Sequence, residues 1–484
     1  MSLGQKIIRG MGSSAASQIG TEVTRVAVMW WLMRQLGPEA FSAWALIFVV
    51  TNLAGMFVEF GFGTAIIQQK GAENDRDLVS SVYWIQTGIG LLFLVLLYIG
   101  APSIAAFYHR PDLVPVYQIC GINFVVAAQS SIPRALLQKA LKFHNMAMVE
   151  VSAEIVASFA ALVALPLGWL WPMVVWMLVR SLVKSALYWW FSGWVPIFSF
   201  SYSSVRPILS FCRNLIGAQI IDYGASNFDR VLLGKLELEG NLLGPYDRAA
   251  SLTVMPARAI GRMVGRVMMP VVARFQSKKD HGLQLILFVL TCVNAVLVPY
   301  VALVMLRSDL IVKLVFGEQW VKMGPFMAVF SVSVFLAGFN AIAVSSLLAF
   351  GRADLNLRIG SFGRGVITLG WGLGALGGVF GMAIGRTLGA MVMTVALAWA
   401  LATATDGTMG RVIWSFRWNV GAFVMTLGLG SVLPVGSSWG GLIGLGLFCG
   451  CVAWLISGVG ILSELRKVRK ILSSHDQEVQ NGRA

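Results

Sequence analysis

Long apolar stretches recur from one end of the chain to the other. A helix needs about 20 apolar residues to cross a hydrocarbon core of roughly 30 Å. Fourteen such stretches can be drawn, covering residues 11–33, 41–66, 79–107, 114–133, 146–166, 170–194, 208–233, 249–273, 283–306, 324–350, 359–376, 379–403, 414–434 and 440–463. Helices satisfy their own backbone hydrogen bonds in lipid. The pattern therefore predicts an all-α polytopic membrane protein with 14 transmembrane helices.

Composition excludes a soluble protein. Of the 484 residues, 57% are hydrophobic and 12% are charged, and the mean hydropathy is +0.76. A soluble domain carries about 25% charged residues, so no polar catalytic domain is expected. The net charge is +15, but no basic block is interleaved with aromatic residues, and nucleic acid is not expected as a partner.

The basic residues are distributed unevenly between the two sides of the predicted membrane. With cytoplasmic termini, 22 Lys and Arg residues lie on the inside and 7 on the outside. Positive charge is retained on the cytoplasmic side during insertion. The sequence therefore predicts a multi-pass protein with both termini in the cytoplasm. The 22 include Arg213, Arg364 and Arg417, which lie near the cytoplasmic ends of their spans, and the other 8 basic residues lie deeper within the spans.

Two short patterns repeat at a distance of about 200 residues. Leu36-Gly37-Pro38, which follows Arg25, is echoed by Leu243-Gly244-Pro245, which follows Arg230. Internal repeats are common in transporters, which place their substrate site at the repeat interface. We therefore expect a six-helix lobe at 1–197, a second at 198–405, two additional helices at 406–463 and a basic cytoplasmic tail at 464–484.

The eighth predicted span carries three arginines. Arg258, Arg262 and Arg266 are spaced by four residues and so share one helix face. Placing a charged side chain inside a membrane costs free energy, so such a side chain is expected to face a water-filled cavity or an oppositely charged partner. One interpretation is a cationic wall for an anionic substrate, because guanidinium groups bind phosphate and carboxylate through two parallel hydrogen bonds. The alternative is an amphipathic helix that lies on the membrane surface.

Acidic residues within the spans are candidates for coupling or gating. Asp222 and Asp229 are seven residues apart in the seventh span, close to Arg230. Either carboxylate could bind a proton or Na⁺, or could pair with an arginine of the next span. Glu22 could neutralise Arg25, its neighbour by three positions. Arg25 is also the counterpart of Arg230 in the repeat.

Further charges are open to two interpretations. Glu59, near the cytoplasmic end of the second span, could act in gating or form a salt bridge to a neighbouring helix. Glu150 is expected to be solvated and Glu154 to lie deeper, while Arg180 and Lys184 could face a central cavity. The lone Arg386 is expected to pair locally.

Patterns that suggest other chemistry are not supported by their context. Gly372–Gly377 matches a nucleotide-binding glycine motif, but no strand precedes it. Instead, Gly377, Gly381, Gly385 and Gly389 place small residues on one helix face, which permits close helix approach. Four scattered histidines show no metal-ligand spacing. No catalytic residue, metal or cofactor is expected.

Several segments resemble a known family, the Wzx-type polysaccharide flippases of the polysaccharide transporter branch of the multidrug/oligosaccharidyl-lipid/polysaccharide (MOP) exporter superfamily. The most specific is residues 227–235 (NFDRVLLGK) followed by 243–249 (LGPYDRA). Looser matches are Leu36-Gly37-Pro38 with Ala43-Trp44, residues 59–68 (EFGFGTAIIQ) and residues 134–143 (RALLQKALKF).

The resemblance implies that a polyprenyl-diphosphate-linked oligosaccharide crosses the bacterial inner membrane by alternating access, for exopolysaccharide or O-antigen biosynthesis. It also implies a cationic central cavity, to which Arg258, Arg262, Arg266, Arg25 and Arg230 would contribute. The implied partners are the lipid-linked oligosaccharide, membrane lipids, a coupling H⁺ or Na⁺, and the polysaccharide polymerase and export machinery.

Two other functions stay open at this point. One is an ion-coupled drug or cation antiporter of the same superfamily, which would need an acidic cavity. Basic residues outnumber acidic ones within the predicted spans, which disfavours this function. A membrane polysaccharide polymerase, which is an enzyme, would carry a large periplasmic loop. The predicted outside loops are all short.

Overall fold

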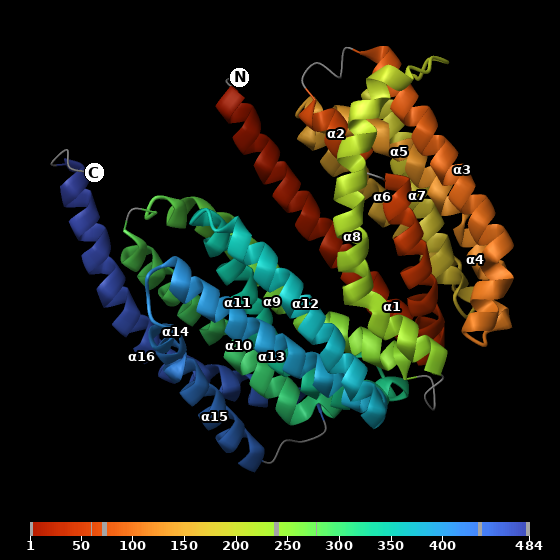
Figure 1. Cartoon of the computed structure of the whole chain (residues 1–484). Coiled ribbons are helices and arrows are strands. Elements are labelled where there is room, and N and C mark those ends of the chain that lie inside the picture. Colours follow the sequence, from red (N-terminus) through yellow and green to blue (C-terminus); the bar gives the residue numbers. More distant parts are fainter. Residues whose placement is uncertain are drawn as a thin grey trace. The chain divides into compact units, whose positions relative to one another are not determined.

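The computed structural model describes residues 3–59, 61–69, 75–236, 242–276, 278–433 and 438–480, and all its longer elements are helices (Figure 1). The side chains of residues 3–19, of a few residues along the seventh predicted span, of Arg266 and of residues 470–480 lie outside the description. The chain forms two compact units, Met1–Gly244 and Pro245–Ala484. All fourteen predicted spans fall on helices, which confirms the all-α class.

The first unit contains eight helices in the described ranges. They are α1 (Leu3–Glu59), α2 (Phe62–Gln68), α3 (Arg76–Phe107), α4 (Val114–Cys120), α5 (Ile122–Lys139), α6 (Phe143–Val163), α7 (Trp171–Ser192) and α8 (Tyr202–Leu236). A core of buried apolar side chains, including Phe62, Val82, Ile132 and Ile208, joins α2, α3, α5 and α8. In lipid such packing contributes chiefly through close van der Waals contact.

A kink divides α1 where the first two predicted spans meet. Gly37 has φ 76° and ψ 176°, and Pro38 follows it. A positive φ is accessible to glycine without steric cost, and proline has no N–H for the helix ladder. Ser42 Oγ donates to Pro38 O at 3.0 Å and accepts from Gly244 N at 2.7 Å. The two Leu-Gly-Pro repeats therefore meet at this kink.

The second predicted span, 41–66, is not one continuous helix. α1 ends at Glu59, and Gly61, with φ 72°, precedes α2. A left-handed residue at this point stops the helical hydrogen-bond ladder. Hydropathy alone does not register such a break, because the residues on both sides of it are apolar.

The second unit contains α9 (Leu243–Ala273), whose first two residues belong to the first unit, and seven further helices. They are α10 (Lys279–Val315), α11 (Gly324–Ala349), α12 (Ala353–Gly374), α13 (Gly378–Ala404), α14 (Met409–Ser415), α15 (Arg417–Val432) and α16 (Trp439–Gln480). α10 contacts α11, α15 and α16. The core collects buried residues such as Leu290, Ile342 and Leu401 from α9 through α14.

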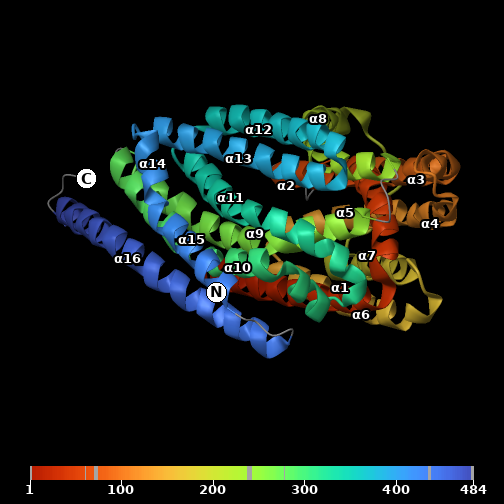
Figure 2. The same ribbon diagram turned by 90° about the horizontal axis from the view of Figure 1, so that it is seen from below.

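The glycines predicted to allow close helix approach do so between α12 and α13, which run side by side (Figures 1 and 2). A Cβ atom added to Gly385 would lie 2.0 Å from Gly370 O, and one added to Gly381 would lie 2.3 Å from Gly374 O. Gly389 is similarly close to Ile367. Gly377 is the exception, because it lies in the 3-10 turn that joins the two helices.

We expect Gly385→Ala to lower the free energy of unfolding by about 2 kcal/mol, because the new methyl group forces apart two packed backbones. The measurement is thermal unfolding of the purified protein in detergent. Gly372→Ala is the matched control, since no atom lies within 4 Å of its added Cβ. Alanine there is expected to be neutral or stabilising by up to about 1 kcal/mol. Equal unfolding temperatures for the two variants would contradict this account of the seam.

Length and hydropathy support a multi-pass membrane protein. Nine stretches within the described residues are long and apolar enough to cross a bilayer. Ala353–Ala404 contains two predicted spans, and Gly20–Gln68 contains the second predicted span and residues 20–33 of the first. α7, α8 and α9 are not among the nine, so the count of 14 remains a prediction. The predicted lobe boundary at 197 also remains one, although α8 packs on α1, α2 and α3 in the first unit.

Candidate functional site

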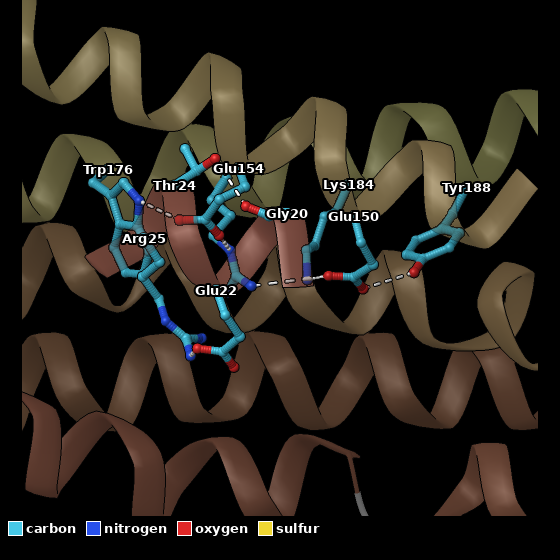
Figure 3. A network of polar contacts seen from close by, with 10 residues as sticks. Gly20, Glu22, Thr24, Arg25, Glu150, Glu154, Trp176, Lys184 and Tyr188 are labelled. Carbon is cyan, nitrogen blue, oxygen red and sulfur yellow. Dashed lines mark hydrogen bonds and ion pairs between the residues drawn. The ribbon is translucent and has the colours of Figure 1, made fainter. Parts of the chain in front are cut away.

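Charged residues gather on α1, α6 and α7 inside the first unit (Figure 3). On α1, Arg25 forms an ion pair with Glu22, one turn earlier. The local neutralisation suggested by their spacing is therefore present. Arg25 also lines a small pocket of about 280 Å³, with Trp44 from the second half of α1 and Met173 and Trp176 from α7.

Glu154 on α6 is fully buried and is held from α7. Its carboxylate accepts a hydrogen bond from Arg180 Nε at 2.8 Å and another from Trp176 Nε1 at 3.2 Å (Figure 3). The Arg180 guanidinium also lies over the Trp176 ring, 5.3 Å from its centroid. A buried charge is tolerated where it is paired and hydrogen-bonded, and these contacts supply that condition.

Glu150, one turn before Glu154, continues the same network. It pairs with Lys184 of α7, accepts a hydrogen bond from Tyr188 Oη at 2.9 Å, and lies 3.9 Å from Arg180 Nη2. Glu150 is less solvated than expected, because Lys184 and Tyr188 contact it and leave its side chain 31% exposed. Two acidic residues on α6 thus meet two basic residues on α7 with the same spacing of four. That matched spacing was the available signal, and sequence reasoning did not connect the two helices.

In the second unit, the charges of α9 lie apart from its packed face. Ile260 and Val264 pack against the core of this unit, while Arg258 and Arg262 are exposed. At 3.6 residues per turn the arginines fall on the opposite side from Ile260 and Val264. The shared face predicted from the spacing is therefore present for Arg258 and Arg262. The side chain of Arg266 lies outside the described residues.

Close packing fixes the orientation of α9. Cβ atoms added to Gly261 and Gly265 would lie 2.7 Å from Ala341 Cβ and 2.6 Å from Ser345 Oγ, both on α11. Two small residues four positions apart let helices approach closely. This seam and the apolar face hold α9 against its own unit, and Arg258 and Arg262 lie exposed beside the seam.

The motif on α8 serves packing within the first unit. Asp229 is buried, and its Oδ1 accepts a hydrogen bond from the backbone N–H of Arg230 at 2.9 Å. The Arg230 guanidinium donates to Asn227 Oδ1. A Cβ added to Gly234 would lie 2.3 Å from Leu46 on α1. The motif therefore sits where α8 approaches α1 closely.

The remaining predicted residues are placed as follows. Glu59 is exposed at the last residue of α1, and no ion pair joins it to another described residue. The Asp222 side chain lies outside the described residues. Arg386 on α13 contacts Tyr246 Oη of α9 at 3.5 Å and lies over the Phe330 ring of α11, so these partners come from other helices and the expected local pairing stays a prediction.

A helical protein with membrane-length apolar segments and charges held among them belongs to the class of multi-pass membrane proteins. The profile of a family described as polysaccharide biosynthesis protein matches residues 31–325. The chain belongs to this family. The expected membership in a polysaccharide biosynthesis family is thereby confirmed.

Named relatives match over most of their length. The lipopolysaccharide biosynthesis protein WzxC of Escherichia coli (strain K12) is 28% identical over 82% of this chain and 80% of its own. The teichuronic acid biosynthesis protein TuaB of Bacillus subtilis (strain 168) is 27% identical over 78% of this chain and 76% of its own.

Two solved structures share the fold. An inward closed conformation of the lipid II flippase MurJ is 12% identical, with a TM-score of 0.76 over 93% of this chain and 99% of its own. An inward-facing multidrug resistance MATE family transporter of the MOP superfamily is 16% identical, with a TM-score of 0.59 over 80% of this chain and 96% of its own. At these identities the likeness concerns the fold.

Proposed function

We propose that this protein is a flippase that moves a polyprenyl-diphosphate-linked oligosaccharide from the cytoplasmic to the outer face of the bacterial inner membrane by alternating access. Both termini would lie in the cytoplasm. The transported unit would then be used in the biosynthesis of a surface polysaccharide such as an exopolysaccharide or O-antigen. Membership in a polysaccharide biosynthesis family and the names of the relatives support this assignment.

The observation that carries the proposal is the arginine face of α9. Arg258 and Arg262 lie one turn apart and are exposed. α9 has 31 residues, which at 1.5 Å per residue is about 46 Å and enough to cross a bilayer. A charged diphosphate does not enter the hydrocarbon core unless polar groups replace its hydration. Guanidinium groups can do so, because each can donate two parallel hydrogen bonds to phosphate oxygens. The polyprenyl tail can stay in lipid while the head follows this face.

The pairing of other membrane charges favours an anionic substrate over a cationic drug. The carboxylates of Glu22, Glu150 and Glu154 are each engaged by an arginine or a lysine of the first unit. A drug or cation antiporter needs an acidic group that can receive the substrate or its counter-ion. Moving a lipid between leaflets makes or breaks no covalent bond, so the protein would act as a transporter and not as an enzyme.

Coupling to H⁺ or Na⁺ would involve an acidic residue among Asp222, Asp229, Glu22 and Glu59. Asp229 is the described member that is buried on a helix of the first unit. Proton binding at Asp229 would change the charge next to Arg230 on the same helix.

A deletion strain tests the proposed function. We expect loss of the surface polysaccharide and accumulation of its lipid-linked repeat unit on the cytoplasmic leaflet, measured by labelling in intact and permeabilised cells. Accumulation of single repeat units on the outer leaflet would identify a polymerase instead. Normal polysaccharide combined with increased drug sensitivity would identify a drug antiporter. Either result would overturn the proposal.

A further inference from the structure

A basic pocket lies at one end of the first unit, where three membrane-length helices begin or end. Its empty volume is about 850 Å³. It is formed where α3 begins at Arg76, α5 ends at Lys139 and α7 ends at Ser192, and these helices are neighbours in the fold (Figure 1). Its lining residues are Arg76, Leu136, Leu137, Lys139, Ala140, Lys142, Ser192, Gly193 and Trp194.

Three cations and no carboxylate line this pocket among the described residues. Lys139 Nζ donates to the carbonyl oxygens of Ile66 at 3.0 Å and Gln69 at 2.5 Å, so its charge is fixed at the end of α2. Arg76 and Lys142 are exposed. The nearby Asp75 carboxylate caps α3 by accepting a hydrogen bond from Leu78 N at 2.9 Å. The pocket therefore presents a surplus of positive charge to a ligand.

An ordered cluster of aromatic rings forms the wall on the Trp194 side. Trp194 packs against Tyr83 and Trp189, with ring centroids 5.6 and 5.8 Å apart. Trp189 Nε1 donates to Gln129 O at 2.9 Å, and Tyr83 Oη donates to Gln129 Oε1. Aromatic rings with a polar edge are enriched where a membrane meets water. A wall of this composition suits the level of the lipid headgroups.

The segment that follows this wall, residues 193–201, is tied to α3. Ser80 Oγ accepts from Ile197 N at 3.1 Å, Ser81 Oγ accepts from Ser201 N at 2.9 Å, and Trp84 Nε1 donates to Ile197 O at 3.0 Å.

Large apolar side chains point outward on and around this segment. Phe198 is 95% exposed, Trp190 on the last turns of α7 is 81% exposed, and Phe200 is also exposed. The connection is held in place by α3, and aromatic side chains on and beside it point outward next to a cationic pocket. Such a surface is suited to the boundary between the acyl chains and the headgroups of a membrane.

We propose that this pocket binds the phosphate group of an anionic membrane phospholipid, with the acyl chains lying over the aromatic side chains of 190–200. Arg76 and Lys142 contact the phosphate, while Lys139 holds α2 in place. In the proposed topology this end of the unit faces the cytoplasm. The binding site is separate from α9 and independent of which glycan the protein transports.

The test compares lipid binding by native mass spectrometry of the full chain in detergent, with phosphatidylglycerol or phosphatidylcholine added at equal concentrations. Wild-type protein is expected to retain phosphatidylglycerol in preference to phosphatidylcholine. The double variant Arg76→Gln with Lys142→Gln is expected to bind phosphatidylglycerol about tenfold more weakly, because each basic residue near an anionic surface contributes measurably. Phosphatidylcholine binding is expected to be unchanged.

A matched control removes the same charge elsewhere. Arg466→Gln with Arg469→Gln alters two exposed arginines of α16 and is expected to leave phosphatidylglycerol binding unchanged. If the first double variant does not fold, Lys142→Gln alone is used, with an expected loss of about threefold. Equal losses in variant and control would overturn the proposal, because they indicate diffuse electrostatic binding. Displacement of the lipid by equimolar inorganic phosphate or by a polyprenyl diphosphate would also overturn it.

Discussion

Changing Arg258 and Arg262 together to glutamine is expected to reduce export of the lipid-linked oligosaccharide by at least tenfold. Glutamine keeps a hydrogen-bond donor but removes the charge. A hydrogen bond to a charged group contributes about 1.5–3 kcal/mol, and about 1.4 kcal/mol corresponds to a factor of ten. The measurement is surface polysaccharide produced by a deletion strain that carries the variant at wild-type protein level.

Two further variants separate charge from structure. Arg358→Gln on α12 changes another exposed arginine of the same unit and is expected to leave export intact. Replacing Arg258 and Arg262 by lysine keeps the charge and is expected to restore part of the export. Full export by the glutamine double variant would mean that the arginine face does not bind the substrate.

The largest expected effect on stability is at Glu154. Glu154→Gln is expected to lower the free energy of unfolding by about 3 kcal/mol, because it leaves the charge of Arg180 without its buried partner. The effect lies at the low end of the range for such changes, since Arg180 keeps Glu150 at 3.9 Å. Thermal unfolding in detergent measures the change.

The matched control is Glu318→Gln, since Glu318 is exposed and its partner Lys313 is exposed as well. An exposed ion pair contributes little to the free energy of unfolding. Adding Arg180→Met to Glu154→Gln removes the unpaired charge and is expected to recover part of the loss. An unfolding temperature for Glu154→Gln equal to that of wild type would show that the pair does not stabilise the first unit.

The helical class could be predicted from the sequence, because every segment that crosses a membrane has to satisfy its own backbone hydrogen bonds. Apolar runs of membrane length must satisfy their backbone groups internally, so every predicted span falls on a helix. The two helix breaks at Gly37 and Gly61 were not equally predictable from hydropathy. The first was anticipated as a gap between spans, while the second was hidden within one, because a single left-handed glycine leaves hydropathy unchanged.

Contacts of the candidate site could be predicted from the sequence only where both residues lie on the same helix. The common face of Arg258 and Arg262 and the pair Glu22–Arg25 depend on the spacing along one helix. The contacts of Glu154 with Arg180 and the pocket formed by Arg76, Lys139 and Lys142 depend on how separate helices meet. The matched spacing of four on α6 and α7 was a signal for the first of these features, but spacing along each helix does not show which helices meet, and that became visible with the structure.

The backbone contact between α12 and α13 limits how the second unit can deform. Gly370, Gly374, Gly381 and Gly385 leave no side-chain layer that could slide or compress between the two helices. We therefore expect α12 and α13 to move together as one rigid body. Bending during a transport cycle must then be absorbed elsewhere, and α10 offers a place at Arg307, where the backbone leaves helical geometry with φ −142° and ψ 36°.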